Sequence, residues 1–115
     1  MSIDEGTHKY VLISAKHPNH SDDDDDKQYF VVSKKGAAYH RNVAEGFVSK
    51  LEAHGYSNIH ILGGGRISLD SLNTKISIFG FSYGFGLADH SLSQRVIQSD
   101  ARFQTFDINW SNDGY

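Results

Sequence analysis

The clearest alternation of apolar and polar positions in this chain lies over Ala37–Gly55. At about 100° per residue, the turn of an α-helix, apolar residues gather on one side of this stretch and polar residues on the other. The apolar side holds Val43, Ala44, Phe47, Val48 and Leu51, and the polar side holds Arg41, Asn42, Glu45, Ser49 and Glu52. The pattern predicts one amphipathic helix, which Gly55 ends in a left-handed conformation.

His40 falls within the apolar side of this helix, in its first turn. A first turn has unpaired N–H groups and partial positive charge, which disfavour an imidazolium and attract anions. The position therefore indicates a neutral histidine that can act as a base beside an anion. The alternative is a core histidine hydrogen-bonded to a neighbour, and this stretch taken alone favours that alternative.

The remaining pattern predicts six strands, rich in β-branched and aromatic residues. They are Lys9–Ala15, Gln28–Ser33, Ser57–Leu62, Arg66–Asp70, Lys75–Phe81 and Phe103–Trp110. The first lacks strict alternation, which is typical of a strand covered on both faces. Ser71–Thr74 is expected to join two of these strands as a hairpin.

Ala88–Ser99 is predicted to form a second helix, with Asp89 as its N-cap. Its inner face would hold Leu92, Val96 and Ile97. The element order is then β-β-α-β-β-β-α-β, which predicts an α/β fold. We expect a single domain over residues 1–115, a mixed sheet of about six strands flanked by two helices.

Two segments show no such pattern. Met1–Thr7 is expected to be a loose tail. Lys16–Lys27 contains the chain's one proline and the run Asp22–Asp26, and like charges this dense repel one another, so we expect an exposed acidic loop. A solvated insertion is favoured there over a recognition element for basic partners.

Composition argues against several classes of function. The net charge of −3 argues against nucleic-acid binding, and no apolar run has the roughly 18 residues of a membrane span. The acidic, polar N-terminus is unlike a signal peptide. The absence of cysteine excludes disulfides and thiol catalysis. We expect a cytoplasmic monomer without nucleic-acid or membrane partners.

Two glycine-rich segments are candidates for chemistry. In Leu62–Ser68, LGGGRIS, three glycines allow a sharp turn, and the guanidinium of Arg66 suits a phosphate or carboxylate. In Gly80–Gly86, the hydroxyl of Ser82 and successive N–H groups would suit an anion. Neither segment matches a nucleotide-binding fingerprint, and taken alone each is more often a structural turn.

The chain has seven histidines, which raises the question of a metal site. His17 and His20 lie just before the acidic run, but a mobile loop is poorly preorganised for a metal ion. His54 and His60 are expected to be structural. His8 and His90 are next to candidate active-site segments, and a surface role is favoured for them over a supporting role behind the site. No metal or other cofactor is therefore expected.

Several strings in this order resemble the small janus-type phosphohistidine phosphatase family. They are Lys9–Ile13 (KYVLI), Tyr39-His40, Leu62–Ser68, Gly80–Gly86, His90 and the terminal Trp110–Tyr115 (WSNDGY). The resemblance covers nearly the whole domain except the tail and the acidic loop. The chain departs from the usual family pattern at Val32–Ala37, at Arg41–Val43 and at Tyr83-Gly84. These differences bear on substrate preference more than on chemistry.

The resemblance implies a metal-independent phosphatase that acts on phosphohistidine in proteins. It implies that His40 is the essential catalytic residue, as general base or nucleophile. It also implies that Lys9 helps to hold the phosphoryl group, that Ser82, Tyr83 and Gly84 cradle its oxygens, and that Arg66 supports the pocket. The alternatives are a non-catalytic module that binds phosphopeptides or anions, and a structural interaction domain with a closed pocket.

Overall fold

The computed structural model describes residues 1–18 and 27–112, which form one mixed sheet and two helices. The strands are β1 (Ser2–Ile3), β2 (Gly6–Lys16), β3 (Lys27–Ser33), β4 (Ser57–Asp70), β5 (Lys75–Phe79) and β6 (Asp107–Trp110). They lie in the order β1-β3-β2-β4-β5-β6. The outer pairs, β1 with β3 and β5 with β6, are parallel, and the inner pairs are antiparallel. The predicted α/β fold with a mixed sheet is confirmed.

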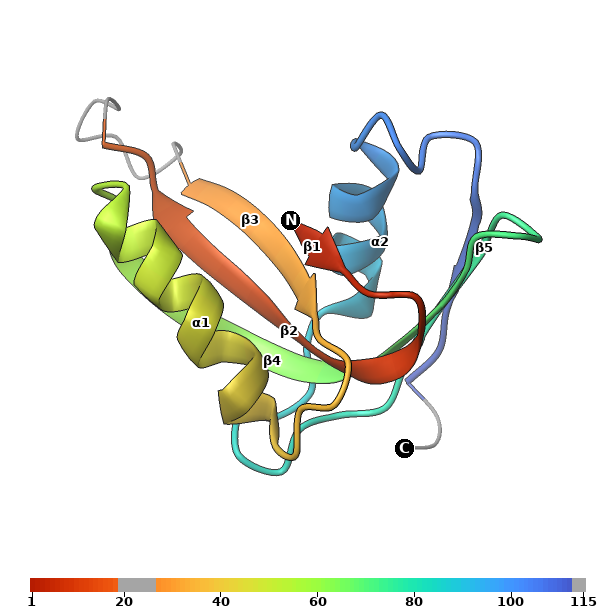
Figure 1. The fold of residues 1–115 in the computed structure, drawn as a ribbon, viewed down its shortest axis with the longest axis horizontal. Coiled ribbons are helices and arrows are strands. Elements are labelled where there is room, and N and C mark those ends of the chain that lie inside the picture. Colours follow the sequence, from red (N-terminus) through yellow and green to blue (C-terminus); the bar gives the residue numbers. More distant parts are fainter. Residues whose placement is uncertain (19–26, 113–115) are drawn as a thin grey trace.

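The helices α1 (His40–Ala53) and α2 (His90–Gln98) cover opposite faces of this sheet (Figure 1). Alternate residues of β2 belong to different cores, since Tyr10 and Leu12 pack with α2 while Val11 and Ile13 pack with α1. Residues 10–15 are all buried, which confirms the prediction of a strand covered on both faces.

Helix α1 begins at His40 rather than at Ala37. Its start is fixed by Asn42, whose Oδ1 accepts the N–H of Tyr39 at 3.1 Å and whose own N–H donates to the Tyr39 carbonyl at 3.0 Å. These two bonds satisfy backbone groups at the helix end. Gly55 follows the helix with φ +85°, as predicted for its left-handed end.

The predictions for α2 and the hairpin are also confirmed. The Oδ1 of Asp89 accepts the N–H of Leu92 at 3.1 Å, as an N-cap does. Ile97 is buried, with Leu92 and Val96 partly buried beside it. Residues 71–74 join β4 to β5, whose ends pair at Asp70 and Lys75.

The prediction of a sharp turn at Gly63, Gly64 and Gly65 is wrong. Ser57–Leu62 and Arg66–Asp70 are not two strands separated by a turn, because Ser57–Asp70 is one strand, β4, which pairs with β2 through Gly63, Gly64 and Gly65. The pairing of Leu12 with Gly63 and of Ile13 with Ile61 skips Leu62, which is therefore the extra residue of a bulge in β4 next to this segment.

The two ends of the chain also differ from expectation. The prediction of a loose tail over Met1–Thr7 is wrong, because β1 and the first residues of β2 lie there. The last strand begins at Asp107 rather than Phe103, because residues 101–106 form turns in which the rings of Phe103 and Phe106 pack edge to face.

The expected acidic loop lies mainly outside the described residues, which include none of Asp22–Asp26. In the described part of the chain, neither helix is long and apolar enough to cross a membrane.

Candidate active site

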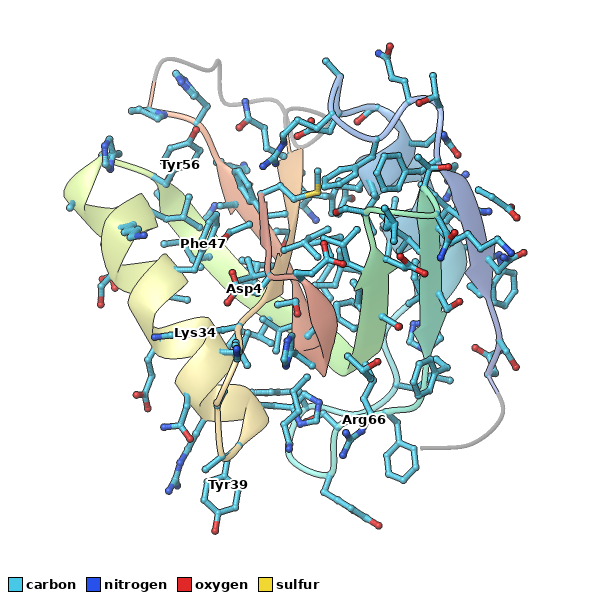
Figure 2. The ribbon with its side chains drawn as sticks, turned by 45° about the vertical axis from the view of Figure 1, so that its right-hand side comes forward. Asp4, Lys34, Tyr39, Phe47, Tyr56 and Arg66 are labelled. Carbon is cyan, nitrogen blue, oxygen red and sulfur yellow. The ribbon has the colours of Figure 1, made fainter. Side chains whose placement is uncertain are left out.

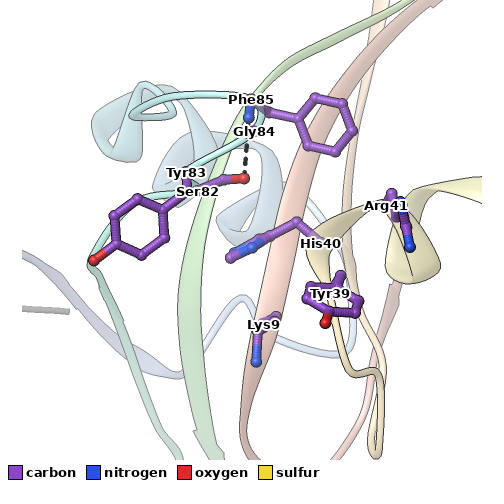
Figure 3. A pocket seen from close by; sticks show the side chains of 8 residues that line it. All are labelled: Lys9, Tyr39, His40, Arg41, Ser82, Tyr83, Gly84 and Phe85. Carbon is purple, nitrogen blue, oxygen red and sulfur yellow. Dashed lines mark hydrogen bonds between the residues drawn. The ribbon is translucent and has the colours of Figure 1, made fainter.

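A cavity of about 680 Å³ opens beside the start of α1 (Figure 3). Three elements supply its lining, which consists of Lys9 from β2, Tyr39, His40 and Arg41 at the start of α1, and Ser82, Tyr83, Gly84 and Phe85 from the loop between β5 and α2. Five of the six predicted site residues, all except Arg66, therefore lie in one cavity.

Gly64 lets two of these elements meet. A Cβ placed on Gly64 would lie 2.9 Å from Cδ2 of His40 and 3.0 Å from Cβ of Ser82. Carbon atoms in contact normally stay about 3.5 Å or more apart. Because Gly64 has no side chain, the ring of His40 and the β5–α2 loop can pack directly against β4.

The ring of His40 is held in one tautomer. Its Nε2 lies 2.9 Å from the carbonyl oxygen of Gly65, which can only accept a hydrogen bond, so Nε2 carries the hydrogen of the neutral ring. The lone pair is then on Nδ1. Because His40 lines the cavity while Nε2 is bound to β4, Nδ1 is the ring nitrogen left for a ligand.

The surroundings of His40 favour this neutral form. Burial lowers the pKa of His40 below its ordinary value, and the positive charges of Lys9 and Arg66 lower it further, while the bond to Gly65 acts in the opposite direction. The side chain is only 7% exposed. His40 is therefore hydrogen-bonded in the core, as the simpler interpretation had it, and also lines a cavity.

The β5–α2 loop is closed by its own hydrogen bonds. Ser82 and Gly86 exchange both backbone bonds, at 3.1 and 2.8 Å, and Oγ of Ser82 accepts the N–H of Phe85 at 3.1 Å. The N–H groups of Ser82 and Phe85 are therefore used inside the loop. The N–H of Gly84 takes part in none of these bonds, and the hydroxyl hydrogen of Ser82 can still be donated, so these two groups can serve an anion.

Beneath the loop lies a buried network that the sequence analysis missed. His90 is not on the surface, since it is 1% exposed and its Nε2–H donates to the carbonyl of Gly80 at 2.8 Å. Its Nδ1 accepts the hydroxyl of Tyr10 at 2.6 Å, and the Tyr10 oxygen accepts from Ser93 at 3.1 Å. Burial raises the pKa of Tyr10 and lowers that of His90.

One sequence signal pointed to this network. His90, Ser93 and Ile97 are spaced as the inner face of a helix requires. Because Gly80 directly precedes the cavity loop, the network anchors that loop to α2 and β2.

A model of the Janus/Ocnus family matches residues 1–107 of this chain. The chain belongs to the Janus/Ocnus family. The matched range contains every residue that lines the cavity, and the resemblance inferred from the sequence is thereby confirmed.

Curated relatives agree with this assignment. The chain is 32% identical over 112 residues to the 14 kDa phosphohistidine phosphatase of Homo sapiens, an alignment that covers 96% of this chain and 87% of that protein. It is 37% identical over 81 residues to the protein of the same name from Sus scrofa, covering 70% and 62%. It is also 30% identical over 108 residues to the sex-regulated protein janus-B of Drosophila melanogaster, covering 94% and 74%.

Arg66 lies beside the cavity of this Janus/Ocnus protein rather than in its lining. It pairs across the sheet with Lys9 on one side and with Phe79 on the other. Figure 2 shows Arg66 and Tyr39 at the same end of the molecule, with Tyr56 at the opposite end. Arg66 thus contributes charge near His40, as its effect on the pKa of His40 indicates.

Sequence reasoning also left out three lining residues, Tyr39, Arg41 and Phe85. Tyr39 and Arg41 are the chain neighbours of His40, which was the one available signal for them. The signal for Phe85 was its place in the candidate segment Gly80–Gly86, although no property of the residue itself indicated that it lines the cavity.

His17 and His54 make local contacts away from the cavity. Nδ1 of His54 bonds to the carbonyl of Lys50 at 2.7 Å, a structural contact as expected, and the ring of His17 packs edge to face on Tyr56. His20 lies outside the described residues. Within residues 1–18 and 27–112, no three His, Asp or Glu side chains gather as metal ligands do.

Proposed function

We propose that this Janus/Ocnus protein is a phosphohistidine phosphatase that hydrolyses the N–P bond of phosphohistidine in proteins. The observation that carries the proposal is the neutral His40 ring, whose Nδ1 lone pair is left for a cavity that Lys9 and Ser82 also line. The names of the human and pig relatives support the same reaction.

The phosphoryl oxygens would be held opposite His40. The ammonium group of Lys9 supplies positive charge, and the Ser82 hydroxyl and the Gly84 N–H supply hydrogen bonds. Donors fixed by the fold stabilise the charge that develops as phosphorus is attacked, without having to reorganise at that moment. Loop closure by Ser82 and Gly86 keeps these donors in place.

His40 can act in two ways, and the proposal includes both. As a general base, Nδ1 takes a proton from water while the water oxygen bonds to phosphorus and the N–P bond breaks. The leaving imidazole takes up a proton from solvent, and His40 then releases its own. As a nucleophile, Nδ1 itself bonds to phosphorus while the N–P bond breaks and the substrate imidazole leaves, taking up a proton from solvent. Water then attacks the phosphoenzyme, which releases phosphate and restores His40. The lowered pKa of His40 keeps the lone pair available at neutral pH in either route.

The proposal also includes catalysis without a metal ion. The N–P bond of phosphohistidine is labile and its imidazole leaves readily, so positioning, positive charge and one base suffice. Proteins that carry phosphohistidine are the partners proposed. A cytoplasmic monomer without nucleic-acid or membrane partners stays a prediction from composition.

The test is release of phosphate from a phosphohistidine peptide, measured in chelator with wild type and with His40→Ala. We expect turnover by wild type and its loss in the variant, while circular dichroism shows that the fold is retained. His54→Ala is the matched control, because His54 bonds only within its own helix end, and it should keep wild-type activity.

The other outcomes are equally informative. Equal activity of wild type and His40→Ala would contradict the role of His40. Saturable peptide binding without turnover would identify a binding module instead. A phosphoryl group trapped on His40 during turnover would establish the nucleophilic route, and its absence under single-turnover conditions would favour water activation.

A further inference from the structure

The mouth of the cavity combines positive charge with exposed aromatic rings. The guanidinium of Arg41 lies over the ring of Tyr39, 5.1 Å from its centroid, a cation–π contact that orients it. Tyr39 is 62% exposed and Tyr83 is 84% exposed. Figure 3 shows Tyr39 and Arg41 on one side of His40 and Tyr83 on the other.

A second hollow, of about 330 Å³, lies on the other side of the helix start. Its lining residues are Lys34, Lys35, Gly36, Ala37, Ala38 and Asn42. Asn42 is bonded to Tyr39, which lines the main cavity, so the two hollows flank one turn of α1. An extended peptide that enters the cavity has a path over this turn into the second hollow.

The charged side chains that line the two hollows are all positive. Among the described residues that line the two hollows, none is acidic, while Lys9, Arg41, Lys34 and Lys35 are basic. The first turn of α1 carries no acidic residue, so its partial positive charge adds to theirs. The nearby carboxylate of Asp4 is used by the N–H of Lys35, at 2.8 Å.

The cavity is also larger than the reacting group. A cavity of about 680 Å³ is of the size that holds a drug-like molecule, so a phosphorylated imidazole leaves room for neighbouring residues of the substrate. Exposed tyrosines offer flat surfaces to such residues at little cost in side-chain entropy.

We propose that the site selects phosphohistidine segments with acidic residues beside the modified histidine, and that Arg41 is the main selecting residue. The identity of the modified histidine rests on the proposed function. Arg41 offers a planar group with several donors, which suits a carboxylate, and in the described part of the chain it forms no ion pair of its own. Lys34 and Lys35 extend the preference to residues further along the substrate.

The test compares peptides that carry a non-hydrolysable phosphohistidine analogue flanked by Asp-Asp, Gly-Ser or Lys-Lys. Fluorescence anisotropy gives their Kd values, and the corresponding phosphohistidine peptides give kcat/KM. Since exposed ion pairs contribute modestly, we expect wild type to bind the acidic peptide about threefold to tenfold more tightly than the neutral one. The preference should shrink in 0.5 M salt, where screening shortens to about 4 Å.

Arg41→Glu should abolish or invert the preference between the acidic and the lysine peptide. The matched control is Lys50→Glu, the same change of charge in the last turn of α1, about 13 Å further along the helix. This control should keep the wild-type preference. Lys34→Glu with Lys35→Glu should reduce it by a smaller factor.

The proposal is overturned if wild type binds the acidic and neutral peptides equally, or if Lys50→Glu alters the preference as much as Arg41→Glu. Failure of the proposed function has a different signature. In that case no peptide is hydrolysed, while the Kd values of the analogue peptides still decide whether acidic flanks are preferred through Arg41.

Discussion

Replacing Gly64 by alanine tests whether close packing against β4 positions the ring of His40, the proposed catalytic residue. The added Cβ would lie 2.8 Å from the carbonyl oxygen of Tyr10, 2.9 Å from Cδ2 of His40 and 3.0 Å from Cβ of Ser82. The Tyr10 oxygen belongs to the backbone of β2, so relieving that contact requires a shift of the β2–β4 pairing, and the side chains of His40 and Ser82 must move as well. To reach an ordinary contact of 3.4 Å, the His40 ring has to move by about 0.5 Å.

Two measurements should change together. Overpacking a core of this kind costs about 1 to 3 kcal/mol of the free energy of unfolding. In a domain of this size that lowers Tm by roughly 4 °C or more. Because a misplacement of about 1 Å costs about a hundredfold in rate, a shift of half that size should lower kcat/KM for a phosphohistidine peptide about tenfold.

Gly46→Ala is the matched control. Gly46 lies within α1, and a Cβ added there would meet nothing within 4 Å, so alanine fits and should raise helix stability by up to about 1 kcal/mol. Its kcat/KM should equal that of wild type. If Gly64→Ala also kept the wild-type kcat/KM and Tm, the approach of His40 and Ser82 to β4 would not be what positions the ring.

Two further predictions concern the buried histidines. Tyr10→Phe leaves Nδ1 of His90 without its donor, so it should lower the free energy of unfolding by about 1 to 3 kcal/mol in urea titrations, and a loss below about 0.5 kcal/mol would contradict the network. Burial lowers the pKa of His40 and of His90 below the ordinary 6.5. As the pH falls below 6.5, these histidines therefore take up protons in the unfolded chain before they do so in the folded protein, and the free energy of unfolding should decrease. Tm measured between pH 7.5 and 5 should fall less steeply for His40→Ala than for wild type, and equal slopes would exclude this contribution of His40.

The parts of the fold that sequence predicted are those fixed by nearby residues. The apolar face of α1, the Asp89 cap and the hairpin at residues 71–74 each depend on contacts within a few positions of the chain. The helical pattern singled out His40 and the glycine-rich segment singled out Ser82. The resemblance to a family added Lys9 and assigned all three to one site, and they do line one cavity.

The triple glycine shows why the rest was out of reach. Locally, three glycines indicate a turn, because they weaken a strand and allow unusual φ values. In the fold, each of the three instead faces a group from a distant element, and a Cβ would meet the Ala88 backbone at Gly63, the His40 ring at Gly64 and the His90 ring at Gly65. These contacts join residues more than 20 positions apart, and no local pattern contains them.

The two buried histidines show the same limit for the site. Both His40 and His90 begin a helix, both donate Nε2–H to a glycine carbonyl, and burial lowers the pKa of each. They differ in the other nitrogen, since Nδ1 of His90 is bonded to Tyr10 while His40 lines the cavity. Reactivity therefore depends on what β2 and the β5–α2 loop place beside Nδ1, and residue type, helix position and charge state are the same for both rings. A histidine in a first helical turn becomes a candidate base only where the fold leaves that nitrogen a cavity.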